Sequence, residues 1–250
     1  PHKLGGFDIT FTANFVLIND EVKTFNIDDV VEGNYFSGES TPTILGSSDA
    51  NADVDIDGTT IYNMPNGLDI PTIPVPVLQV GIGLIKGTEI DIRYVPETKF
   101  GKAGQVSILG FGIKHDLLQW IPVVGDAIPM SLSLQGGYTT LNTELKISEQ
   151  EVSLNTKATT INLVASKRLL MFTGYAGVGY NSATTTFSSN ANFDLGGVQF
   201  DEKVEMKFES NKNVRANIGL RLNITLVTIQ ADYTFSEYPT ATLGLGVSLR

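Results

Sequence analysis

The chain has 250 residues, a length that suits one domain or one β-barrel. Its 27 acidic and 17 basic residues give a net charge of −10, which argues against nucleic-acid binding. The lack of cysteine excludes disulfides and thiol chemistry, and no run approaches the ~18 apolar residues of a transmembrane helix. A helical membrane protein is therefore excluded as well.

The first predicted element is a strand over residues 7–15, where Phe7, Ile9 and Phe11 alternate with polar residues. Because the chain enters this strand without an initiator Met, we expect a further segment before Pro1. Residues 17–75 lose the alternation, are acidic, and are too long for a plain connection. We expect a long extracellular loop region there, with room for one hairpin, for example around Val22–Val31 and Thr59–Asn63.

Alternating patterns return after residue 75. They predict strands over 78–84, 89–94, 105–115, 130–139, 152–165, 168–180, 184–193 and 197–208. A phase slip near Leu109-Gly110 predicts a bulge. Residues 116–129 instead suggest a short helical periplasmic connection, with Asp116 as helix cap and Pro122 as helix end. Its Trp120 suits a lipid interface, and a hydrophobic plug over one barrel end explains it equally well.

The final stretch carries the clearest pattern, with long alternations over 214–223, 227–235 and 241–249. Strands in soluble proteins run about 5–6 residues, whereas tilted membrane strands need about 9–11. About twelve strands, or about fourteen with a hairpin in 17–75, predict an all-β, transmembrane, antiparallel up-and-down barrel. A soluble β-sandwich is the alternative, and it would gather one set of residues in a dry core: Phe7, Phe11, Leu220, Ile229 and Leu245.

If Arg250 ends on the periplasmic side, the short turns are mostly periplasmic and the longer loops extracellular, as in an outer-membrane barrel. The polar residues would then face the lumen. The candidate lumen-lining residues are Asp8, Gln79, Glu89, Asp91, Arg93, Lys203, Glu205, Arg215, Arg221, Gln230, Asp232 and Arg250. Both signs of charge occur, so these residues can pair and fill the barrel, or line an open pore without marked ion selectivity.

Two glycine patterns and one acidic pattern invite other interpretations. Gly81-Ile82-Gly83 and 174–179 lack the following helix of a phosphate loop, so they indicate room inside the barrel or bending. Asp53, Asp55 and Asp57, followed by Gly58, match the start of a calcium loop. Position twelve would be Met64 instead of the usual glutamate, so a solvated acidic loop is the competing interpretation of this calcium site.

Catalysis has little support in the sequence. His2 and His115 are the two histidines, no GxSxG signature occurs, and no histidine cluster could hold a catalytic metal. His115 follows a strand and precedes Asp116, which favours a structural or interface role. We therefore expect no enzyme and no cofactor other than calcium.

Four segments resemble a family of uncharacterised bacterial outer-membrane β-barrels: His2–Asp8, Gly87–Tyr94, Gly112–Pro122 and Ala231–Thr234. The resemblance covers most of the chain outside 17–70. In broader organisation the chain is similar to the long-chain fatty-acid porin superfamily, in which strands surround an N-terminal plug. That similarity implies passage of hydrophobic molecules only by analogy of fold.

These observations predict an integral outer-membrane barrel of a Gram-negative bacterium. It would contact outer-membrane lipid and, in one interpretation, other outer-membrane proteins. Its expected function is transport of small solutes, hydrophobic ones included. The alternative is a structural or accessory subunit of a larger outer-membrane complex, with a closed lumen.

Overall fold

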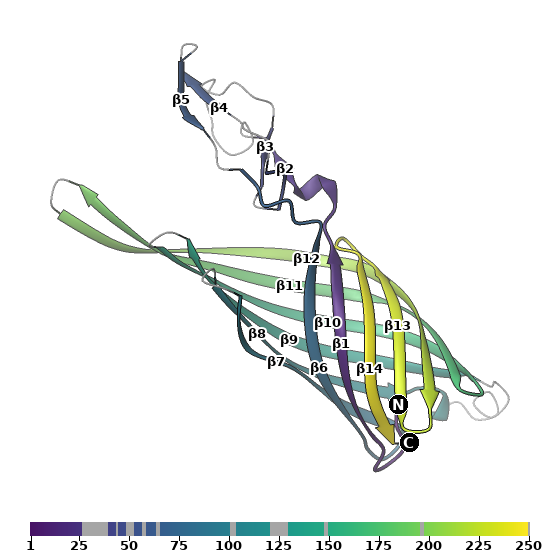
Figure 1. Ribbon diagram of the computed structural model, residues 1–250. Coiled ribbons are helices and arrows are strands. Elements are labelled where there is room, and N and C mark those ends of the chain that lie inside the picture. Colours follow the sequence, from purple (N-terminus) through teal and green to yellow (C-terminus); the bar gives the residue numbers. More distant parts are fainter. Residues whose placement is uncertain are drawn as a thin grey trace. The chain divides into compact units, whose positions relative to one another are not determined.

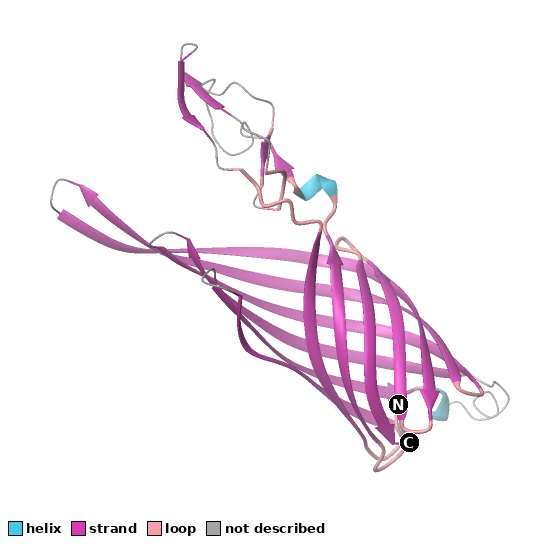
Figure 2. Ribbon diagram, viewed as in Figure 1, coloured by secondary structure: helices cyan, strands magenta, loops and turns pink. Residues whose placement is uncertain are grey.

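The computed structural model describes residues 1–26, 40–43, 45–48, 53–56, 59–63, 66–100, 104–120, 130–147, 150–195 and 198–249. Strands make up most of this part of the chain (Figure 2). The barrel strands are β1 Phe7–Leu17, β6 Thr72–Gly83, β7 Thr88–Phe100, β8 Gly104–Asp116, β9 Ser131–Ile147, β10 Gln150–Leu169, β11 Phe172–Leu195, β12 Val198–Ile224, β13 Val227–Phe235 and β14 Thr240–Leu249.

These ten strands form a closed barrel, in which β1 lies between β14 and β6 and every other strand neighbours the strand next to it in sequence (Figure 1). The described pairs from β6 to β13 are all antiparallel. The expected all-β, antiparallel, up-and-down barrel is therefore confirmed. No helix among the described residues is long and apolar enough to cross a bilayer.

The barrel has ten strands because two of its strands each cover two of the expected segments. Strand β11 runs through residues 181–183, where a register shift interrupts the alternation without ending the strand. Strand β12 likewise continues through 209–213. Residues 196–197, between these two strands, lie outside the described residues. Each merger of two expected strands reverses the direction expected for every later strand. Because there are two mergers, β13 and β14 run in the expected direction.

One expected bulge lies elsewhere. The register of β8 is continuous past Leu109 and Gly110 on both sides, and the shift occurs in β7 between Val95 and Thr98. Val95 is buried, and its partner Ile108 is half-buried. Because Ile108 is apolar but faces inward, the alternation of apolar and polar residues in the sequence is interrupted there although the strand is regular. This interruption explains the misplaced bulge.

Along most of the barrel strands, polar side chains are buried and apolar side chains are exposed. In β1, Asp8, Thr10 and Thr12 are buried, whereas Phe7, Ile9 and Phe11 are exposed. Strand β14 repeats the pattern, with Leu245 59% exposed beside a buried Gly244. The residues of the sandwich core proposed above are exposed instead, which rules out the soluble β-sandwich: Phe7, Phe11, Leu220, Ile229 and Leu245.

The chain forms two compact units, and the barrel unit contains residues 1–14, 76–237 and 241–250. The other unit contains Phe15–Val75 and Tyr238–Thr240. It holds two small antiparallel pairs, β2 Thr24–Phe25 with β3 Thr41–Pro42 and β4 Asp53–Ile56 with β5 Thr59–Asn63. The single-turn 3-10 helix Asp20–Val22 precedes them. The expected strand at 59–63 is therefore present as β5, but it pairs with β4 and not with the expected segment 22–31, whose described strand β2 pairs with β3.

The connection after β8 begins with a 3-10 helix, Leu118–Trp120. The Leu118 main-chain N–H donates to Asp116 Oδ1 at 3.0 Å, so Asp116 caps this turn as the sequence predicts. Residues 121–129, with the expected helix end at Pro122, lie outside the described residues.

Candidate functional site in the barrel interior

Two glycines of β6 open space for polar side chains inside the barrel. Gly81 pairs with Asp91 of β7, and Gly83 pairs with Glu89. A Cβ atom on Gly81 would lie 2.3 Å from Asp8 Oδ1 and 2.9 Å from Asp91 Oδ1. On Gly83 it would lie 2.1 Å from the Lys3 carbonyl oxygen. Because both positions lack a side chain, groups from β1, β7 and the N-terminal segment approach one another above β6.

The side chains of His2, Asp8 and Glu89 meet in this space, and we call them the interior triad. All three are buried. The ligand-type atoms of the interior triad lie within 4.8 Å of one another. His2 Nε2 is 3.5 Å from Asp8 Oδ1, and the His2 main-chain N–H donates to Glu89 Oε2 at 2.6 Å. The N-terminal segment is thus held inside the barrel by two carboxylates from different strands.

Two cations from other strands neutralise the carboxylates. Arg221 Nη2 of β12 donates to Asp8 Oδ2 at 3.2 Å, and Lys114 Nζ of β8 donates to Glu89 Oε1 at 3.3 Å. A third carboxylate, that of Asp91, is only 1% exposed. It accepts a hydrogen bond from Gln79 Nε2, whose amide oxygen accepts one from Arg93 Nε. Buried charges of this kind are stable only when paired and hydrogen-bonded.

A second polar group joins β11, β12 and β13. Tyr175 Oη donates to Asp232 Oδ2 at 3.1 Å. A Cβ on Gly219 would lie 2.3 Å from the Tyr175 ring, so this glycine makes room for the tyrosine. Arg215 Nη2 donates to Thr234 Oγ1 at 3.3 Å. Polar side chains therefore fill the barrel at this level too, as expected for an interior of this size.

Most of the predicted lumen-lining residues lie in the barrel interior. Those buried or half-buried there are Asp8, Gln79, Glu89, Asp91, Arg93, Arg215, Arg221, Gln230 and Asp232. Glu205 is a correction, because it is exposed on a part of β12 that pairs only with β11. Lys203 lies in the same part of β12, but its side chain is not described. Arg250 lies outside the described residues.

Three interior residues were not predicted from the sequence: His2, Lys114 and Tyr175. His2 precedes the first strand, so no alternation assigns it to a face. Lys114 and Tyr175 do have a signal, because each lies two residues from an interior glycine of the same strand, Gly112 and Gly177. Counting by two from these glycines would have identified both.

The calcium prediction falls on residues whose side chains the structure does not describe. Asp53 and Asp55 belong to β4, and Asp57 lies outside the described residues altogether. The calcium site stays a prediction.

The second histidine has contacts of a structural kind. His115 Nδ1 lies 2.9 Å from Thr88 Oγ1, and Trp120 Nε1 donates to His115 Nε2 at 2.8 Å. The Lys86 Nζ atom lies 5.8 Å from the centre of the Trp120 ring. Both imidazole nitrogens are therefore engaged in fastening the connection after β8 to the β6–β7 turn.

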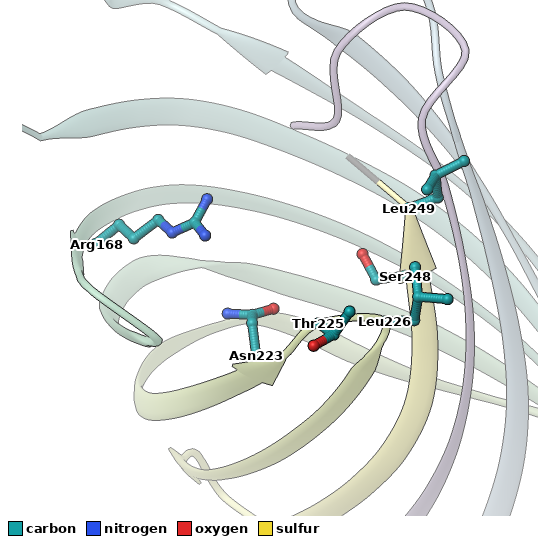
Figure 3. Close-up of a pocket in the computed structure, with 6 residues that line it drawn as sticks. All are labelled: Arg168, Asn223, Thr225, Leu226, Ser248 and Leu249. Atoms are coloured by element: carbon teal, nitrogen blue, oxygen red, sulfur yellow. The ribbon is translucent and has the colours of Figure 1, made fainter.

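A pocket of about 310 Å³ lies at the barrel end that carries the C-terminus. Figure 3 shows its lining residues around the ends of β10, β12 and β14: Arg168, Asn223, Thr225, Leu226, Ser248 and Leu249. Ser248 Oγ and Asn223 Oδ1 are buried there without a hydrogen-bond partner in the described part of the chain.

Together the strand order and the burial pattern define a closed antiparallel β-barrel with a polar, side-chain-filled interior and an apolar outer wall. The chain belongs to a family of unknown function, DUF6588, which matches residues 1–249. A search of curated proteins found no match.

The solved structures that are similar to the chain include two autotransporter domains. The translocator domain of the autotransporter NalP from Neisseria meningitidis has 9% identity and a TM-score of 0.37, over 100% of this chain and 89% of that one. The β domain of the Bordetella autotransporter BrkA has 10% identity and a TM-score of 0.36, over 98% of each chain. The expected similarity to fatty-acid porins stays a prediction.

Proposed function

We propose that the protein is an integral barrel of a bacterial outer membrane and acts as a non-enzymatic accessory or structural subunit. The single observation that carries the membrane assignment is the inverted burial pattern. Phe11, Ile218 and Leu245 are each more than half exposed, whereas Asp8, Glu89 and Asp91 are buried. Burial of one such apolar side chain is worth about 1.5–3 kcal/mol, so a row of them on every strand favours contact with lipid.

The filled interior supports the accessory role over an open pore. The interior triad, its two cations and the Tyr175–Asp232 pair connect side chains from β1, β7, β8, β11, β12 and β13. Barrels of about eight strands are filled by side chains, whereas water-filled porins have about 16–18. Ten strands are closer to the first case.

An unpaired strand edge offers a place for a partner. Strand β12 pairs with β13 only from Ala216 onward, whereas its pairing with β11 extends back to Val198. Figure 1 shows β11 and β12 continuing past the ends of their neighbours. Residues 205–210 are exposed on both faces of β12. Such an edge can accept a strand from another outer-membrane protein.

Transport of small solutes is the second candidate. The pocket between Arg168, Asn223 and Ser248 favours it, because a solute could enter the barrel end there. Passage would require the interior network to separate. The outer wall would still contact lipid, and no nucleic acid takes part.

Conductance measurements distinguish the two candidates. The purified protein is reconstituted into planar bilayers, with insertion verified by resistance to carbonate extraction. We expect insertion without a steady conductance. A stable open channel, or uptake of sugars in liposome swelling, would overturn the accessory role in favour of transport. Complete extraction by carbonate would overturn the membrane assignment itself.

A further inference from the structure

We propose that the interior triad, His2, Asp8 and Glu89, is a binding site for one divalent transition-metal ion, with Zn²⁺ as the best match. The proposal goes beyond the membrane role and does not depend on it. It rests on the donor set, on two unsatisfied buried atoms and on the space above β6.

The donor set suits zinc. One imidazole and two carboxylates are the nitrogen and oxygen ligands that Zn²⁺ accepts, at about 2.0–2.2 Å from the metal. In a tetrahedral site two donors lie about 3.4 Å apart. His2 Nε2 and Asp8 Oδ1 are already at 3.5 Å, and all three donor groups lie within 4.8 Å. The widest separation therefore closes by small side-chain rotations.

Two atoms of the triad lack a hydrogen bond, although Asp8 Oδ1 does lie 3.5 Å from His2 Nε2. Asp8 Oδ1 and His2 Nδ1 are both buried without a hydrogen bond in the described part of the chain. His2 is 6% exposed and Asp8 is 5% exposed, so neither atom is satisfied by bulk water. Unsatisfied buried polar atoms are rare in native structures, and a bound water or ion often accounts for them. A metal bound to Asp8 Oδ1 would satisfy one of them directly.

The space around the triad also suits an ion. The described ion pairs bring three positive groups, Lys114 Nζ, Arg221 Nη2 and the Pro1 amino group, to a cluster that contains three carboxylates with Asp91, so the charges are balanced there. Arg221 and Thr10 bind Asp8 through Oδ2, which leaves Oδ1 available. Gly81 keeps the space between Asp8 Oδ1 and Asp91 Oδ1 clear of a side chain. Asp91 is thus positioned to hold a metal-bound water.

A metal at this position would join three parts of the chain. His2 lies in the N-terminal segment, Asp8 in β1 and Glu89 in β7, with β6 between the two strands. The ion would therefore fasten the N-terminal segment inside the barrel, next to the seam where β1 closes it.

The test uses the purified full-length protein without a histidine tag, stripped with a chelator and titrated with Zn²⁺ by calorimetry. We expect about one Zn²⁺ per chain and a higher unfolding temperature in its presence. His2→Gln should abolish both effects. The matched control is His115→Ala, which removes the other histidine and should retain them. Asp53→Asn with Asp55→Asn excludes the acidic β4 segment as the source of binding.

Binding of Co²⁺ to the wild-type chain provides a second measurement. Its visible spectrum reports nitrogen and oxygen ligands directly, so this result does not depend on whether a variant folds. No stoichiometric Zn²⁺ binding by the wild type would overturn the proposal. Equal binding by His2→Gln, verified as folded by its heat-modifiable mobility in gels, would overturn it as well. Loss of binding in Asp53→Asn with Asp55→Asn alone would assign the metal to the other unit.

Discussion

Gly83 illustrates how a single missing side chain organises the barrel interior. A Cβ there would lie 2.1 Å from the Lys3 carbonyl oxygen and 2.8 Å from His2 Cβ. We expect Gly83→Ala to destabilise the barrel by about 1–3 kcal/mol, because neither backbone nor Cβ atoms can rotate away. Gly174→Ala is the matched control, since a Cβ at Gly174 meets nothing within 4 Å. Urea unfolding of both variants in detergent measures the difference, and equal midpoints would contradict the close packing.

Tyr175 and Asp232 provide a second test at the level of one hydrogen bond. Tyr175→Phe removes the donor at 3.1 Å from Asp232 Oδ2 and leaves a half-buried carboxylate with one partner fewer. We expect a loss of about 1–3 kcal/mol in the free energy of unfolding. Tyr180→Phe changes the same residue type in the same strand, where the side chain is exposed, and should have little effect. A larger loss of stability for Tyr180→Phe than for Tyr175→Phe would show that the two tyrosines face the opposite sides of the barrel wall from those described.

Among the elements, β14 and the outer part of β12 both expose apolar residues, but in different surroundings. Leu245 lies midway along β14 and is 59% exposed, and Met206 is exposed on the part of β12 that has no β13 partner. Leu245→Arg should cost about 2–4 kcal/mol in lipid, as Arg does near the bilayer midplane. Met206→Arg should be nearly neutral in water. Folding efficiency into vesicles measures both, and equal tolerance would contradict a lipid-facing β14.

The strands themselves show which features local sequence can predict. The alternation in β13 and β14 is regular because one face is apolar and outward along its whole length, so position and facing were predictable. The length of β11 and β12 was not. Residues 181–191 are rich in Ser, Thr and Asn, and the shift between Asn181 and Ala183 breaks the period. A strand that leaves the barrel no longer needs an apolar face, so its sequence loses the signal.

The site was less predictable than the strands for a different reason. Alternation assigned Asp8, Glu89 and Asp91 to the interior one by one. It could not show that His2 contacts Glu89, 87 residues away, because that contact depends on the register between β1, β6 and β7. Register is set by pairing between segments that are distant in sequence, so it cannot be predicted from the sequence of a single strand. The glycines at 81 and 83 were the only local indication of crowding there.

For the whole molecule, the barrel predicts which connections lie on the same side of the membrane. The turn between β10 and β11, at Leu170, lies at the same barrel end as the turn between β12 and β13 and the C-terminus (Figure 1). The turn between β13 and β14, at Glu237, lies at the other end. If the C-terminus faces the periplasm, as in other outer-membrane barrels, Leu170 is periplasmic and Glu237 extracellular.

Cysteine labelling tests this arrangement, since the native chain has no cysteine to interfere. A membrane-impermeant maleimide added to intact cells should label Glu237→Cys, because that turn is exposed outside the cell. Leu170→Cys, 90% exposed in the native residue, should react only after the outer membrane is permeabilised. Labelling of Leu170→Cys alone in intact cells would reverse the orientation. Labelling of both variants in intact cells would mean that no membrane separates the two turns. The apolar outer face of the barrel would then need a partner other than lipid.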